Sequence, residues 1–314
     1  MEKKYQPTSD ERIWTALAHG STLLFIFGPL ASLLIWSTQR KKSSYVAFQA
    51  LQALGYQLIA HCIMILLNIL VSLLGVAVLV IIMQVVEDST SNSFGLVFGM
   101  QFFLFASLFG VVGLYYLGGV IAAIFSLVGR DFRYPILGNW LARYLNYIPT
   151  LTGEEPAAEL AEEQEDRWVA AMGHAGLFFQ IWGMFLPLLT WVLHKDRSRI
   201  LRFQSLQTLI YQGLGAVVYF GAMGLYMASF FLVFFPMLVT GTGSSDELTG
   251  IGMIILLVVA VLVMLVYMVG GPIYALLGII ATIRVAGGHD FRYPLLGHIL
   301  ASRLDATSTP APVI

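Results

Sequence analysis

Two histidines are the ionisable side chains that recur within long apolar sequence. His19 and His174 lie in segments 13–39 and 168–194, which contain no Asp, Glu, Lys or Arg. A histidine pair could bind a metal ion or a proton. Because no cysteine or carboxylate accompanies either histidine in its segment, the sequence favours a buried, hydrogen-bonded role instead. We therefore expect no metal, no cofactor and no catalytic residue.

A stripe of two amides and a phenol also occurs twice. At about 100° per residue its members share one helix face, and they are Gln49, Gln52 and Tyr56, then Gln204, Gln207 and Tyr211. Two interpretations stay open. The stripe is either the wet face of a helix lying in the membrane interface, or a polar seam where the two copies meet, since amides hydrogen-bond across helices in lipid.

A third repeated feature is the motif Gly-x-Asp-Phe-Arg-Tyr-Pro, at 129–135 and 288–294. Arginine can reach lipid phosphates, tyrosine suits the aromatic belt of a membrane interface, and proline ends a helix. We interpret the motif as a membrane-interface anchor that precedes short interfacial segments at 136–146 and 295–304. The anchoring side chains would be Arg133, Tyr134, Arg292 and Tyr293.

These pairs belong to an internal duplication. Residues 10–57 align without a gap with 165–212, and sixteen of the 48 positions are identical. We expect a first membrane repeat at 1–147, an acidic flexible linker at 148–164 and a second membrane repeat at 165–314. The linker holds Pro149, Pro156 and five glutamates, a composition typical of a solvated tether.

The composition is that of a membrane protein. The chain has 314 residues, of which 58% are apolar and 11% charged, whereas soluble domains have about 45–50% and about 25%. A net charge of −1 argues against a nucleic-acid surface. The single Cys62 excludes an internal disulfide.

Charge-free runs predict the membrane helices. A bilayer core needs roughly 20 apolar residues in a helix, and only helices or closed barrels can hold backbone in lipid. Six runs exceed that length, namely 13–39, 43–86, 89–129, 168–194, 203–245 and 248–283. We expect an all-α integral membrane protein whose repeats each have a re-entrant or broken helical hairpin, two long transmembrane helices and a short interfacial helix.

The basic residues indicate how the chain is threaded. With three crossings per repeat, the 17 Lys and Arg divide into seven on one side and ten on the other. If 13–38 and 168–193 enter and return on one side, all 17 lie together, as the positive-inside rule favours. Gly28-Pro29, and Gly183 with Pro187, are suitable helix breaks, although a single kinked span is also long enough. We expect a multi-pass bacterial cytoplasmic membrane protein with its termini and basic loops in the cytoplasm.

Short motifs resemble a known family. They are Ala-Leu-Ala-His-Gly at 16–20, Ala-Met-Gly-His-Ala at 171–175, Pro-Leu-Leu-Thr-Trp at 187–191, and Phe-Arg-Tyr-Pro at 132–135 and 291–294. This set is similar to small bacterial membrane proteins of unknown function related to the Tic-twenty subunit of the chloroplast translocon. The chain departs from the pattern where the family has histidine, at Gln49 and Gln204, and where it has asparagine, at Gly55 and Ile210.

The resemblance implies four membrane helices per unit, with both ends on one side, and a role in protein translocation or insertion. We therefore expect a non-enzymatic scaffold, or a translocation- or insertion-related component. Its partners would be the lipid bilayer and other membrane proteins, and not nucleic acid. The alternative is a small-solute or ion channel or transporter with its pathway at the repeat interface. Coupled transport is disfavoured because no carboxylate lies inside any apolar run.

Overall fold

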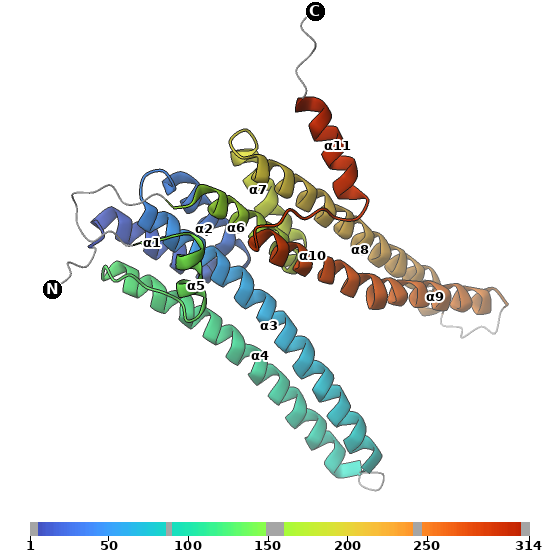
Figure 1. Ribbon diagram of the computed structural model, residues 1–314. Coiled ribbons are helices and arrows are strands. Elements are labelled where there is room, and N and C mark those ends of the chain that lie inside the picture. Colours follow the sequence, from blue (N-terminus) through green and yellow to red (C-terminus); the bar gives the residue numbers. More distant parts are fainter. Residues whose placement is uncertain (1–5, 86–89, 149–159, 241–246, 309–314) are drawn as a thin grey trace, which may run out of the picture.

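The computed structural model describes residues 6–85, 90–148, 160–240 and 247–308, and all regular structure in these ranges is helical (Figure 1). The first repeat consists of α1 (Ser9–Gly20), η1 (Ser21–Phe27), α2 (Gly28–Gln39), α3 (Ser44–Val85), α4 (Thr90–Leu127) and α5 (Leu137–Tyr144). The second consists of α6 (Glu162–Ala175), η2 (Gly176–Met184), α7 (Phe185–His194), α8 (Arg199–Thr240), α9 (Glu247–Leu265), η3 (Val266–Gly270), α10 (Gly271–Ala286) and α11 (Leu296–Ser308).

The element order is therefore the same in both repeats, with one difference in the last long helix. In the first repeat this helix is the single helix α4. In the second repeat a π-helical turn divides the equivalent helix into α9 and α10. Pro272 follows this turn in the first positions of α10, and proline removes a backbone donor from the preceding turn. The predicted fold class, with two repeats of a broken hairpin and two long helices, is confirmed.

Each repeat begins with two short helices that fold back on each other. In the first repeat, the turn between the two helices is closed by the Ser21 hydroxyl, which donates to the Gly28 carbonyl oxygen at 3.1 Å. Further along the two helices, Ser32 Oγ donates to the Ala18 carbonyl oxygen at 3.1 Å. At the open end, Ser43 Oγ donates to the Glu11 carboxylate at 2.6 Å. The helices α1 and α2 are thus antiparallel, so the chain enters and leaves this hairpin at the same end.

A backbone break turns the chain at each tip. Phe25 has φ 49° and Gln180 has φ 54°, values that side chains rarely adopt. Gly28 is required beside the first break because a Cβ there would lie 2.6 Å from the Ser21 carbonyl oxygen. In the second repeat Gly183 packs in the same way against Gly176. Pro187, expected to share in the break, lies instead in the first turn of α7, where proline is tolerated.

The four long helical stretches carry the apolar surface. At about 1.5 Å per residue, the 42 residues of α3 extend for about 63 Å. The outer part of the first long hairpin exposes large apolar side chains such as Phe98, Phe102 and Phe109, each at least 66% exposed. Such a surface belongs against lipid. Six segments are long and apolar enough to cross a membrane, so the chain is a multi-pass membrane protein.

The short hairpins gather into one bundle, from which the long hairpins diverge (Figure 1). The hydrophobic core lies in this bundle, where Leu33, Trp36, Leu51 and Leu54 are fully buried. The helix α6 begins at Glu162, ahead of the predicted start of the second repeat, because acidic residues suit the first turn of a helix. Residues 149–159 of the predicted flexible linker, with the outer turns at 86–89 and 241–246, lie outside the described residues.

Site-specific labelling tests the threading that this fold-back implies. With the native thiol removed by Cys62→Ala, we expect cysteines at the equivalent exposed positions Lys42 and Arg197 to react with an impermeant maleimide from one side. A cysteine at Ser91 should react from the opposite side. From the charge distribution we predict that the first side is the cytoplasmic one.

One labelling result would contradict this threading. If Lys42→Cys and Arg197→Cys were labelled from opposite sides of the membrane, each repeat would cross it an odd number of times, and the short hairpins would be spans.

Candidate functional site

The first repeat contains a buried set of four polar side chains, which we call the first polar clasp. Its members are His19, Gln49, Gln52 and Tyr134, all at most 3% exposed. His19 Nε2 lies 2.9 Å from Gln49 Oε1, and its Nδ1 lies 3.1 Å from the Tyr134 hydroxyl. The clasp therefore joins α1, α3 and the loop that follows α4.

This clasp binds the backbone of the Gly-x-Asp-Phe-Arg-Tyr-Pro loop. The Gln49 and Gln52 amides both donate to the Phe132 carbonyl oxygen, at 3.1 and 3.0 Å. Gln52 Oε1 in turn accepts the Tyr134 backbone N–H at 3.1 Å. Gly129, with φ 79°, allows the chain to leave α4 towards the clasp. The motif is thus a buried loop whose backbone groups are satisfied by two glutamines.

The hydrogen bonds also assign the protonation of His19. Gln49 Nε2 donates to the Asp131 carboxylate at 2.8 Å as well as to Phe132, so Gln49 Oε1 must accept from His19 Nε2–H. Burial raises the pKa of the Tyr134 hydroxyl well above its ordinary value. The hydroxyl therefore keeps its proton. A neutral imidazole protonated at Nε2 can accept a hydrogen bond from this hydroxyl at Nδ1, so that one tautomer satisfies both contacts of the ring.

The second repeat forms a second polar clasp with the same geometry. His174 lies 3.1 Å from Gln204 Oε1 and 3.0 Å from the Tyr293 hydroxyl, and the Gln207 amide donates to the Phe291 carbonyl oxygen at 2.7 Å. Two contacts differ. Thr208, which stands where the first repeat has Ala53, lies with its hydroxyl 2.9 Å from His174 Nδ1. Asp290, the counterpart of Asp131, lies with its side chain 70% exposed and pairs with Arg167 at 3.3 Å.

Both interpretations of the glutamine stripe are wrong. The stripe is not wet, because all four glutamines are at most 1% exposed. Nor does it join the two copies, because its partners are in the loop of its own repeat. The remaining stripe residues have the same role, since Tyr56 stacks on Tyr134 with ring centroids 3.9 Å apart, and Tyr211 stacks on Tyr293 at 3.7 Å.

The membrane-anchor interpretation is wrong for the two tyrosines. Tyr134 and Tyr293 are 3% and 1% exposed, because the clasp histidines and the stacked rings bury them inside the protein. Arg133 and Arg292 do lie closer to the surface. Arg133 pairs with Asp131 at 3.2 Å, and Arg292 is exposed.

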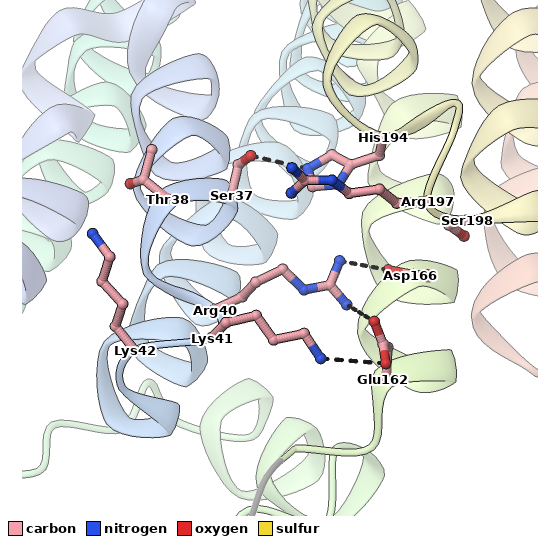
Figure 2. Close-up of a pocket in the computed structure, with 10 residues that line it drawn as sticks. All are labelled: Ser37, Thr38, Arg40, Lys41, Lys42, Glu162, Asp166, His194, Arg197 and Ser198. Carbon is pink, nitrogen blue, oxygen red and sulfur yellow. Dashed lines mark hydrogen bonds and ion pairs between the residues drawn. The ribbon is translucent and has the colours of Figure 1, made fainter.

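The two repeats meet at a separate, charged joint. Arg40, after α2, has its side chain 8% exposed and pairs with Glu165 and Asp166 of α6, each at 2.9 Å. Figure 2 shows the Arg40 guanidinium directed towards α6, with Lys41 beside it on Glu162. Arg40 also lies over the Trp36 ring, 4.4 Å from its centroid.

A cavity of about 190 Å³ opens beside this joint (Figure 2). On its wall Ser37 Oγ lies 3.0 Å from His194 Nε2, a distance that also suits a nucleophile and its base. Within the described residues, His194 Nδ1 has no hydrogen-bond partner that could orient the ring, as nucleophile–base sites require. Nor do three His, Cys, Asp or Glu side chains gather anywhere in that part of the chain to hold a metal ion. The Ser37–His194 contact therefore acts as a link between the repeats.

Apolar packing completes the joint. The Trp168 indole, 2% exposed, donates to the Leu51 carbonyl oxygen at 3.1 Å, and its ring fills the space where a Gly55 side chain would lie. Glycine at this position is therefore explained by contact with the other repeat.

Sequence reasoning missed the joint because the pattern does not show which charges pair. Arg40 and its counterpart Lys195 are both basic, and the acidic pair Glu165 and Asp166 recurs as Asp10 and Glu11, whereas Ser37 corresponds to Val192. The positions of the basic residues at the ends of apolar runs suggested only a role in setting the orientation of the chain in the membrane. The available signal was the pair Glu165 and Asp166, acidic residues directly before an apolar run.

An all-helical, multi-pass membrane protein made of two like repeats is the class that these features define. The chain belongs to the magnetosome magnetite crystal formation protein family (MamF/MmsF), whose profile matches it twice, over residues 10–141 and 165–300. Each matched region includes one complete polar clasp.

This match overturns the resemblance to proteins related to the Tic-twenty subunit. The histidine and Phe-Arg-Tyr-Pro motifs that suggested it are short, and the structure shows that they serve packing within a repeat. Such motifs do not distinguish families of helical membrane proteins. No curated protein and no solved structure matches the chain.

Double-mutant analysis tests whether the clasps are independent. Gln52→Leu and Gln207→Leu each leave buried groups without partners, so each should lower the free energy of unfolding by about 1–3 kcal/mol. Because the two clasps share no hydrogen-bond partner, we expect the two effects to add within about 0.5 kcal/mol. Gln52→Leu with Tyr134→Phe, both in one clasp, should cost less than their sum. Thermal melting in detergent measures these terms, and strong coupling between Gln52 and Gln207 would restore the seam.

The joint predicts a contrast between adjacent residues. Arg40→Ala leaves Glu165 and Asp166 buried without a counter-charge, so we expect a loss of about 3–5 kcal/mol. Lys41→Ala removes an ion pair whose side chains are both 61% exposed, and should cost less than about 1 kcal/mol. Melting of the two variants under the same conditions checks this, and equal effects would argue against a buried joint.

Proposed function

We propose that the protein is a non-enzymatic scaffold of the magnetosome membrane that acts in magnetite crystal formation. The observation that carries the proposal is the family match over both repeats. The description of that family supplies the process. The scaffold role is our inference from the way the chain uses its polar residues.

The polar groups of the bundle are used to hold it together. The histidines and glutamines of the clasps bond the loops of their own repeats. The buried charges of Arg40, Glu165 and Asp166 hold the repeats against each other. Hydrogen-bonded buried networks such as the clasps favour one rigid arrangement. A rigid base that holds two long hairpins in fixed directions (Figure 1) suits a protein that positions groups at a membrane.

The sequence at the far ends of the hairpins indicates which groups are positioned. Glu87 and Asp88 separate the long helices of the first repeat, and Asp246 and Glu247 those of the second. In the threading with two crossings per repeat, this side of the membrane receives no Lys or Arg. Carboxylate oxygens bind iron ions. We propose that these two acidic pairs face the growing mineral.

Crystal size tests the proposal. A magnetite-forming cell that lacks its own family member would receive this chain, or a variant with Glu87→Gln, Asp88→Asn, Asp246→Asn and Glu247→Gln. We expect the chain to restore crystal diameter, measured by electron microscopy, and the variant to fail at equal membrane abundance. A matched control neutralises four carboxylates of the basic side, Glu154, Glu155, Glu159 and Asp196, and should restore it.

Two results would contradict the proposal. Crystals unchanged by the wild-type chain would argue against any role in mineral formation. Full activity of the variant at the hairpin ends would show that these acidic pairs do not contact the mineral. The charged cavity at the repeat interface, where a solute pathway would lie, would then be the next candidate site.

A further inference from the structure

The second repeat contains a basic cavity next to its polar clasp, with Gln204 of the clasp in the wall. It has a volume of about 470 Å³ and lies between the start of α8 and the helix α11. Four guanidinium groups line it, those of Arg167, Arg199, Arg202 and Arg292. Among the described residues that line it, Asp290 supplies the one carboxylate.

The equivalent place in the first repeat is filled by protein. There the Tyr147 ring stacks on Phe48 with centroids 4.0 Å apart and planes 6° apart, and Tyr147 is 6% exposed. The neighbouring Leu145 is fully buried. The helix α5 packs against α3, whereas α11 projects away from the bundle beside α8 (Figure 1).

Three sequence differences between the repeats favour an open, basic cavity in the second. Where the first repeat has Ser44 and Ala47, the second has Arg199 and Arg202. The position equivalent to Tyr147 holds alanine, Ala306. The second copy has thus exchanged a filling ring for a small residue and two small residues for cations. A purely structural site has no need of added like charges, which repel one another.

The cavity is also lined by an aromatic ring, that of Phe203. The Arg292 guanidinium lies 5.8 Å from the centroid of the Phe203 ring. Arg167 is held by Glu163 at 2.9 Å and by Asp290 at 3.3 Å. Among the described residues, no carboxylate forms an ion pair with Arg202 or Arg292, and both are exposed. Arg202 and Arg292 therefore line the cavity without an ion-pair partner among the described residues.

A phosphate group fits this chemistry. Guanidinium groups bind phosphate oxygens in bidentate pairs, and the N-terminus of α8, which begins at Arg199, adds partial positive charge. The volume exceeds that of a phosphate ion and leaves room for the group esterified to it. The cavity also lies on the basic side of the chain, beside helices that face lipid.

We propose that this cavity binds a phosphate group, carried either by the headgroup of an anionic phospholipid or by a free phosphate. Arg202 and Arg292 make the principal contacts, Arg199 adds charge, and Arg167 is positioned by its two carboxylates at the rim.

Titration of the purified full-length protein in neutral detergent tests the proposal. One arm uses inorganic phosphate and the other dihexanoyl phosphatidic acid, with binding followed by calorimetry. The variant Arg199→Ser with Arg202→Ala gives the second repeat the residues of the first. It should bind at least tenfold more weakly, since each charge-assisted contact contributes about a factor of ten. The control Arg284→Ala with Arg303→Ala removes the same charge outside the cavity and should bind like the wild type.

Each outcome decides a point. Tighter binding of the phosphatidic acid identifies a headgroup site, and equal binding of both probes identifies a site for the phosphate group alone. Arg199→Lys with Arg202→Lys should keep part of the affinity, which separates charge from fold. Absence of saturable binding to the wild type, or equal affinities of the wild type and Arg199→Ser with Arg202→Ala, would overturn the proposal.

Discussion

The structure depends on one constraint, which is that polar groups withdrawn from water must bond to each other. Each repeat leaves its last long helix through a loop whose backbone would otherwise be buried without partners. In each repeat, two glutamines donate hydrogen bonds to the phenylalanine carbonyl oxygen of that loop, and a histidine is hydrogen-bonded to its tyrosine hydroxyl. Because His19 and Tyr134 are 115 residues apart, these bonds close the whole repeat into one unit.

Bonds within the repeats are symmetric, and bonds between them are not. The two clasps use identical residue types at equivalent positions, as a duplicated unit must if each copy is to fold. The joint uses contacts of Arg40 with Glu165 and Asp166, and of Trp168 with Gly55, and neither contact has a counterpart at the equivalent positions of the other repeat. Each clasp therefore holds its own repeat together, while residues at the ends of the apolar runs hold the two repeats against each other.

The sequence allowed most of the fold to be predicted and little of the site. Charge-free runs locate the long helices, and Gly28 locates the fold-back, because both follow from local properties of the chain. The loop residues that Gln49 and Gln52 bind lie 80 or more residues away. Helical periodicity shows that these side chains share a face, but not what covers that face. Tyrosine next to arginine and proline likewise suits a membrane interface and a buried loop equally, and only the positions of His19 and His174 distinguish them.

The two copies show where a duplicated membrane protein is free to change. Replacing a clasp residue is costly, since losing one partner leaves another buried and unbonded. The surface next to the clasp, at the start of the second helix, carries no such penalty. In the first repeat this surface is covered by Tyr147 and Leu145. In the second, the same backbone frame presents Arg199 and Arg202 around an open cavity. A fixed polar interior therefore lets one copy remain structural while the other acquires a charged site.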